Sequence, residues 1–287
     1  MTALTVRAMT AADIPGANRL RQLAGWNQTE KDWQRFLQLS PNGCFVACAD
    51  GKVCGTVTAL NYQNRFGWIG MILVDPEFRK RGIGTRLLEV GIECLKNMNV
   101  ETAKLDATPM GRPLYHQRGF VEEYAIERWE RPPAGIELDN AKSTVLPAIT
   151  RDDLDSVCAQ DEPIFGANRS GLLRQLWQEN PSLGAVVHSS NEVVGYALGR
   201  SGARACYLGP WIAKDNAVAE VLLLEFLRRT RDQPVFVDIC LENSRACELV
   251  KAAGFQRQRP LTRMYRGPNN HPGQPKLICG IAGPELG

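Results

Sequence analysis

The chain has 287 residues, of which 44% are hydrophobic and 23% are charged, the ordinary composition of a globular protein with one large or two average domains. Its formal net charge of +3 is too small to indicate a nucleic-acid partner. The N-terminus lacks the apolar core of a signal peptide and no apolar run approaches about 18 residues, so neither secretion nor membrane insertion is expected.

The nine cysteines predict a reducing compartment. Their number is odd, no C-x-x-C pair occurs, and most of them lie within apolar segments, as buried free thiols do. We therefore expect a cytoplasmic protein. The three histidines do not pair at ligand spacing, so no metal is expected.

Hydrophobic periodicity in the first half predicts strands and helices in alternation. Asp50-Gly51 is a hairpin signal between two of the strands. In chain order we expect a strand (4–9), two helices (11–23 and 30–39), three strands (44–49, 52–60 and 66–74), a helix after Gly84, a strand (102–107), a short helix containing Tyr115 and a strand ending at Trp129. Residues 132–145 lose periodicity and are interpreted as a linker.

The most informative segment joins the strand that ends at Val74 to the long helix after Gly84. It contains the cations Arg79, Lys80 and Arg81, followed by Gly82-Ile83-Gly84. A basic, glycine-rich turn between strand and helix suits a phosphate, because the free N–H groups and the dipole of a helix start attract anions. Glycines let the backbone approach the ligand closely. The spacing Arg-x-x-Gly-x-Gly is neither a dinucleotide fingerprint nor a Walker loop.

A second segment follows at residues 105–120, where a strand end leads to Tyr115 and then to Gly119-Phe120. Together, the two segments resemble the acyl-CoA pyrophosphate loop and the tyrosine signature of the GNAT superfamily of N-acetyltransferases. The resemblance implies an α/β fold (α+β in some schemes), with a mixed, mostly antiparallel twisted sheet, a central splayed strand pair and flanking helices. It also implies acetyl-CoA as cosubstrate.

The same resemblance assigns the cosubstrate's contacts. Leu73 and Val74 would offer backbone groups to the pantetheine arm, in the manner of an added strand, while their side chains belong to the sheet core. The other cofactor-binding residues that it implies are Arg79, Lys80, Arg81, Gly82, Ile83, Gly84, Thr85 and Thr108.

Catalytic candidates are fewer. Tyr115 is the expected general acid for the CoA thiolate, although a tyrosine there could instead hydrogen-bond a carbonyl at the edge of the core. Many relatives carry a glutamate on the strand before the loop, but residues 68–73 contain no carboxylate. Asp106, at the end of the next strand, is the best-placed base; it could also bind a substrate ammonium or cap the following turn. A water chain from backbone carbonyls is an equal alternative.

The acceptor cleft of GNAT folds is walled by the segment between the first two helices. Here that segment contains Trp26 and Asn27, which could stack on and hydrogen-bond a ligand. Thr29 and Asp32 form a capping-box pattern that starts the second helix and explains Thr29 structurally.

The second half repeats the first. Gly55 and Gly195 are 140 positions apart, Gly70 and Gly209 are 139 apart, and Gly119 and Gly254 are 135 apart. The separation between matching positions shortens within the phosphate loop. The counterpart of this loop, residues 212–220, has no glycine and contains two acidic residues. Val250 stands in the place of Tyr115. We interpret residues 1–131 as the acetyl-CoA-binding catalytic domain, 132–145 as a linker, and 146–287 as a degenerate copy with a C-terminal extension.

The function expected is transfer of an acetyl group from acetyl-CoA to a primary amine of a small molecule, by direct attack in a ternary complex. The alternative is a non-catalytic regulatory protein that binds acyl-CoA. The second copy should bind no acetyl-CoA, but it could shape the acceptor cleft or support a homodimer. Neither nucleic acid nor a membrane is expected as a partner.

Overall fold

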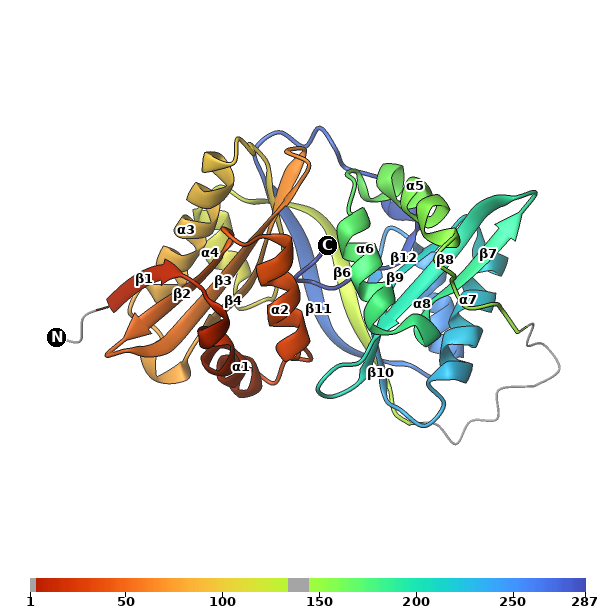
Figure 1. Cartoon of the computed structure of the whole chain (residues 1–287), viewed down its shortest axis with the longest axis horizontal. Helices are drawn as coiled ribbons and strands as arrows, with labels where there is room; N and C mark the ends of the chain where they lie inside the picture. The colour runs from red at the N-terminus through yellow and green to blue at the C-terminus, as the bar shows by residue number, and fades with distance from the viewer. Residues whose placement is uncertain (1–3, 134–144) are drawn as a thin grey trace.

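The computed structural model describes residues 4–133 and 145–287, so most of the expected linker lies outside the described residues. Its first half, at the left of Figure 1, has the predicted order of elements. These are β1 (Leu4–Ala8), α1 (Ile14–Leu23), α2 (Glu30–Leu39), β2 (Cys44–Ala49), β3 (Lys52–Tyr62), β4 (Phe66–Val74), α3 (Ile83–Asn97), β5 (Ala103–Ala107), α4 (Arg112–Gln117) and β6 (Val121–Arg131).

The second half repeats this order from the first helix pair onward. Its elements are α5 (Asp153–Phe165), α6 (Ser170–Glu179), β7 (Ala185–Ser189), β8 (Glu192–Arg200), β9 (Cys206–Ala213), α7 (Asn216–Arg229), β10 (Val235–Cys240), α8 (Ser244–Ala252), β11 (Gln256–Arg266) and β12 (Ile278–Gly280). Short 3₁₀ helices are η1 (Ala11–Asp13), η2 (Pro76–Phe78), η4 (Pro181–Leu183) and η5 (Pro275–Leu277). Gly55 and Gly195 each lie beside a bulge of a matching hairpin, which confirms the internal repeat.

The twelve strands of the described residues form one sheet in the order β1-β2-β3-β4-β5-β11-β6-β10-β12-β9-β8-β7. The last strand of each half is therefore exchanged. β11, from the second half, inserts between β5 and β6, and β6, from the first half, pairs with β10. Figure 1 shows β6 and β11 side by side at the centre of the molecule. The sequence repeat did not predict this exchange.

Buried ion pairs fix the exchanged strands. On β6, the Arg128 guanidinium donates two hydrogen bonds to Asp238 of β10, at 2.9 and 2.5 Å. On β11, Arg263 donates two to Asp106 of β5, at 2.8 and 2.9 Å. Removing one partner of such a pair leaves an uncompensated buried charge, at a cost of about 3–5 kcal/mol. Each half thus depends on charges supplied by the other.

Helices cover both faces of the sheet. Buried residues of α1, α2, α5 and α6 form one apolar core that is continuous across both halves. On the opposite face, α3 and α7 pack over separate cores. Alternate residues of β2 show the division, since Val46 belongs to the shared core and Ala47 to the α3 core. No helix in the described ranges has both the length and the apolarity to cross a bilayer.

The C-terminal extension crosses back over both halves. After β11 the chain returns to insert β12 between β9 and β10, where Gly280 pairs with Trp211 and Ile239. It then runs on to β4, and a Cβ on Gly70 would meet Glu285 Cα at 3.0 Å. At the corresponding glycine of the second half, Gly209, a Cβ would meet the Ile281 carbonyl oxygen at 2.0 Å. The two glycines therefore leave space for the extension to pass.

The strand exchange predicts how a truncated chain behaves. A chain ending at residue 140 retains β5 and β6 but lacks β11, which lies between them. It also leaves Asp106 and Arg128 without their buried partners. We expect this fragment to be insoluble or to lack a cooperative thermal transition, measured by calorimetry.

Co-production with residues 141–287 is the control and should restore a folded complex. A 1–140 fragment with a sharp transition of its own would show that the exchange is dispensable.

Candidate active site

A cavity of about 800 Å³ opens where β4 and β5 separate. The two parallel strands pair only at Gly67–Ala103 and Trp68–Lys104, and they diverge beyond that point. A bulge at Met71, whose φ is +51°, interrupts the pairing of β4 with β3 there. The expected splayed pair is confirmed, and the cavity lies along the edge of β4 that has lost its partner.

The phosphate loop occupies one end of this cavity. Gly82, with a φ of +76°, is the N-cap residue of α3. Among the described residues, no side chain accepts a hydrogen bond from the N–H groups at this helix start. The first helix-internal hydrogen bond at this end is donated by Arg86 to Gly82, so the N–H groups of Ile83, Gly84 and Thr85 have no partner within the helix. Uncapped N–H groups and the positive helix end make an anion site.

Nearly all predicted cofactor contacts line the cavity. The residues that do are Leu73, Val74, Arg79, Lys80, Gly82, Ile83, Gly84, Thr85 and Thr108. Arg81 is the exception, because its guanidinium packs over the Phe78 ring at 5.2 Å and donates to the Glu77 carbonyl at 3.3 Å. The hydroxyl of Thr108 accepts from the Gly111 N–H at 3.2 Å and so helps to start α4.

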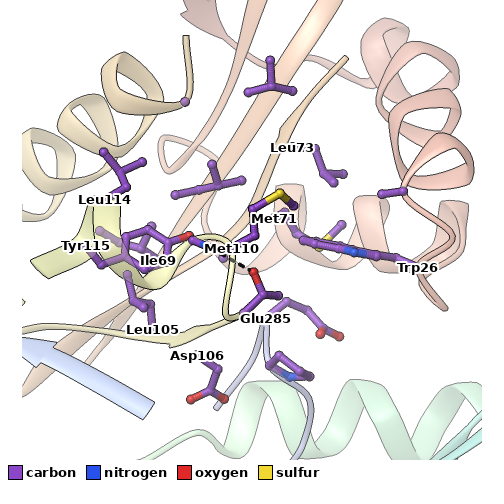
Figure 2. A pocket seen from close by; sticks show the side chains of 18 of the residues that line it. Trp26, Ile69, Met71, Leu73, Leu105, Asp106, Met110, Leu114, Tyr115 and Glu285 are labelled. Carbon is purple, nitrogen blue, oxygen red and sulfur yellow. Dashed lines mark hydrogen bonds between the residues drawn. The ribbon is translucent and has the colours of Figure 1, made fainter. Parts of the chain in front are cut away.

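Tyr115 extends from α4 into the cavity, opposite Trp26 in the view of Figure 2. Its ring packs against Phe120 with centroids 6.0 Å apart. No hydrogen bond of its hydroxyl is found among the described residues, so the alternative of a carbonyl partner in the core finds no support. Burial raises the pKa of Tyr115 to about 12, which keeps the hydroxyl protonated at neutral pH.

Asp106 does not have the surroundings of a base. It borders the cavity, but both carboxylate oxygens accept from Arg263, and its side chain is fully buried. Both oxygens of this carboxylate already accept from a cation, which stabilises the charged form and disfavours proton uptake. The sequence could not indicate this partner, because Arg263 arrives with the exchanged strand. Asp106 thus joins β5 to β11 instead of serving as the predicted base.

The two predicted acceptor residues have different surroundings. Trp26 lines the cavity, as expected. Asn27 is buried outside it: its amide donates to the Ala205 carbonyl at 3.0 Å and accepts from the N–H groups of Arg204 and Ala205. The prediction that Asn27 binds substrate is therefore replaced by a structural contact between the halves. The capping box is present, since Thr29 donates to Asp32 from both its N–H and its hydroxyl.

The second half has lost the corresponding site. Only residues 214–215 separate β9 from α7, where residues 75–82 separate β4 from α3. Asp215 caps α7 by accepting from the Val218 N–H at 3.0 Å, so a carboxylate already occupies the position of a bound anion. Val250 is buried in the core, and β12 fills the gap between β9 and β10.

Sequence reasoning missed the residues that the second half contributes to the lining of the cavity. These are Arg259 and Leu261 of β11, together with Pro284 and Glu285 of the C-terminal extension. The available signal was weak: a short apolar run at residues 277–282, followed by Gly283-Pro284. The described residues contain no cluster of side chains suited to a metal ion.

A splayed strand pair, an uncapped helix start beside it and a tyrosine in the same cavity are the features that the resemblance to the GNAT acetyltransferases implied. Comparison with known families agrees. Residues 16–120 match the acetyltransferase (GNAT) family, and residues 157–279 match an acetyltransferase (GNAT) domain. The chain belongs to the GNAT acetyltransferases and is a tandem member with two such domains.

Relatives of similar length are found. Holothin acyltransferase of a Pseudoalteromonas species is 26% identical over 91% of this chain and 87% of its own. An uncharacterized N-acetyltransferase of Bacillus subtilis, YitH, is 25% identical over 85% of each chain. The crystal structure of a putative acetyltransferase from Pyrococcus horikoshii shares the fold, with a TM-score of 0.82 and 24% identity over 100% of this chain and 97% of its own.

Gly84→Val tests the phosphate loop. A Cβ at Gly84 would meet only Val74 Cγ2, at 3.6 Å, so the protein should accommodate the substitution while the new methyl groups obstruct an approaching phosphate. Titration calorimetry should show at least a 100-fold loss of acetyl-CoA affinity. Gly171→Val on α6, where a Cβ also has ordinary contacts, is the matched control. Unchanged affinity in folded Gly84→Val would contradict the loop assignment.

The stoichiometry of acetyl-CoA binding tests the second half. Because Asp215 occupies the α7 start and β12 fills the gap beside it, we expect one acetyl-CoA per chain. Calorimetric titration measures this number directly. A second site would be inconsistent with a degenerate copy.

Proposed function

We propose that this protein transfers the acetyl group of acetyl-CoA to a primary amine of a small molecule, by direct attack in a ternary complex. The observation that carries the proposal is that one cavity contains an uncapped helix start, an unpaired strand edge and the Tyr115 hydroxyl. Each matches a different part of the reaction. No covalent enzyme intermediate is required.

The cosubstrate would lie along β4. Its pyrophosphate binds the N–H groups of Ile83 and Gly84, with Arg79 and Lys80 supplying positive charge. The pantetheine arm follows the free backbone of Leu73 and Val74, as an added strand would. This path brings the thioester to the splay, near Tyr115. As the amine attacks and charge develops on sulfur, the protonated hydroxyl donates a hydrogen bond and a proton to the leaving thiolate.

Cavity size supports a small acceptor. About 800 Å³ falls in the usual range for small-molecule sites, and the cosubstrate takes part of it. The extension and Arg259 border the end where the acceptor would lie. A relative that matches most of the chain is named holothin acyltransferase, a name that makes holothin its acceptor.

Two further expectations belong to the proposal. All nine cysteines are free and eight are buried, which supports a reducing compartment such as the cytoplasm. A homodimer stays a prediction. The rival function, acyl-CoA sensing without turnover, is less well supported, because a sensor has no need of an unpartnered tyrosine hydroxyl beside the thioester.

The test of the proposal is release of CoA thiol from acetyl-CoA in the presence of a panel of primary amines, including aminothiols, amino acids and polyamines, with acetylated product identified by mass spectrometry. Amine-dependent release supports the enzyme. Tight acetyl-CoA binding without release with any amine would favour the sensor.

Tyr115→Phe tests the acid. Removing the hydroxyl should lower kcat by about 10²–10⁴-fold and leave acetyl-CoA affinity within about threefold, since the ring still packs on Phe120. Because the pKa is about 12, the wild-type hydroxyl should remain protonated, and the rate should show no loss of this donor below about pH 10. Tyr265→Phe, on β11 outside the cavity, is the matched control. A loss smaller than threefold on a chemistry-limited rate would return Tyr115 to a structural role.

A further inference from the structure

The proposed reaction needs a proton acceptor that β4 does not supply. A primary amine has a pKa near 10 and reaches the site as an ammonium at neutral pH, so it must lose a proton before it attacks. Among the described residues, two carboxylates line the cavity, those of Asp106 and Glu285. Arg263 occupies both oxygens of Asp106. Glu285 is therefore the group whose surroundings need explanation.

Glu285 reaches the cavity from the second half of the chain. The C-terminal extension passes over β4 at Gly70, whose missing side chain leaves room for Glu285 Cα. Two first-half side chains hold it there: the Tyr62 hydroxyl donates to the Leu286 carbonyl at 2.7 Å, and Trp68 Nε1 donates to that of Pro284 at 3.0 Å. In Figure 2 its carboxylate lies on the same side of the view as Trp26. The extension thus places a carboxylate beside a strand that has none.

The carboxylate is oriented but only half satisfied. Arg200 Nη2 donates to Glu285 Oε1 at 2.5 Å. Oε2 is buried, and no hydrogen-bond partner for it is found among the described residues. Buried polar atoms in native proteins are nearly always paired, so an orphan of this kind calls for a missing partner. Because Glu285 lines the cavity, that partner can be a molecule bound there.

We propose that Glu285 Oε2 is the base that removes a proton from the acceptor's ammonium group, which assigns a catalytic residue of the first-half site to the second half of the chain. The proposal rests on the proposed function. It also favours an acceptor that arrives as an ammonium, because only such a group must give up a proton before its nitrogen can attack.

The protons balance in this scheme. The ammonium first gives one proton to Glu285 Oε2, and the free amine lone pair then forms the C–N bond to the thioester carbon. The C–S bond breaks, and the Tyr115 hydroxyl gives its proton to the departing thiolate. The new amide nitrogen loses its excess proton, which restores the hydroxyl, and Glu285 returns its proton to solvent. The products are the acetylated amine, CoA thiol and one proton.

The charges around Glu285 support this task. Burial raises the pKa of the Glu285 carboxyl above its ordinary value, and the nearby Asp32 carboxylate raises it further, whereas the guanidinium group of Arg200, the backbone N–H of Glu285 itself and the guanidinium group of Arg128 lower it. A raised pKa makes a carboxylate a stronger base near neutrality. The charged and titratable groups that act on Glu285 are Asp32 of α2, Tyr62 of β3, Arg128 of β6, Arg200 of β8, Tyr207 of β9 and Arg259 of β11.

A purely structural role, as counter-ion to Arg200, explains less. Arg200 also donates to the Ala282 carbonyl and lies 3.5 Å from Asp32, and it engages a single oxygen of Glu285. Two other buried arginine pairs of this chain, Arg128–Asp238 and Arg169–Asp161, use both carboxylate oxygens. The free oxygen is thus the feature that a structural role leaves without purpose.

Glu285→Gln is the decisive variant, because the amide oxygen can still accept from Arg200 while the side chain can no longer take a proton. With an amine that the wild type acetylates, kcat should fall by about 10²–10⁴-fold, and calorimetric acetyl-CoA affinity should stay within threefold. The wild-type rate should fall as pH drops through the raised pKa of Glu285, and this acidic limb should be missing in the variant. Glu285→Asp keeps the charge and should retain part of the rate and the limb.

Glu179→Gln is the matched control. Glu179 also pairs with a buried arginine between the halves, Arg35, but it lies outside the cavity, so its loss should change kcat by less than threefold. Three results in folded Glu285→Gln would overturn the Glu285 assignment: normal turnover, an unchanged pH profile, or a change confined to KM. Each of them would leave the proposed function standing. If Glu285→Gln does not fold, Glu285→Asp decides by the same two readouts. Failure of the wild type to acetylate any amine overturns both.

Discussion

The antiparallel pairing of β6 with β11 is the contact on which the rest of the molecule depends. Each strand is the last of its own half, and each lies between the other half's strands. Without these two strands in their exchanged places the sheet would end at β5 and at β10, and Asp106 and Asp238 would lack their arginines. The exchange therefore joins the two repeated halves in one continuous sheet, and residues of both halves line the cavity.

This arrangement lets the two copies diverge in opposite directions. In the first half, β4 and β5 separate and the gap stays open as a cavity. In the second half, β9 and β10 separate at the corresponding place, but β12 fills the gap and Asp215 caps the helix that would hold a phosphate. The same extension that closes the second cleft then continues to the rim of the first. One segment thus serves as structural filling for one copy and as a wall for the other.

Local features of this protein were predictable from sequence and long-range ones were not. The phosphate loop, the Tyr115 helix and the bounds of α2, β2 and β4 follow from turn residues, periodicity and spacing within short windows. The assignments of Asp106 and Asn27 failed for a shared reason. Their partners, Arg263 and the backbone of residues 204–205, lie more than 150 positions away and arrive through the contact between the halves. Spacing within a motif carries no information about such partners.

The same limit applies to the missing carboxylate of β4. Its sequence lacks an acidic residue, which taken alone weakens the argument for catalysis. Residue 70 of β4 is a glycine, and the C-terminal extension occupies the space that a side chain would take there. A carboxylate that β4 lacks can therefore be supplied by Glu285, far along the chain. Leaving Glu285 Oε2 buried without a partner costs about 1–3 kcal/mol, and the fold tolerates it because the hydrogen bonds from Tyr62, Trp68 and Arg200 fix the segment regardless. An oxygen held unsatisfied by such a frame is poised for a proton that only the substrate brings.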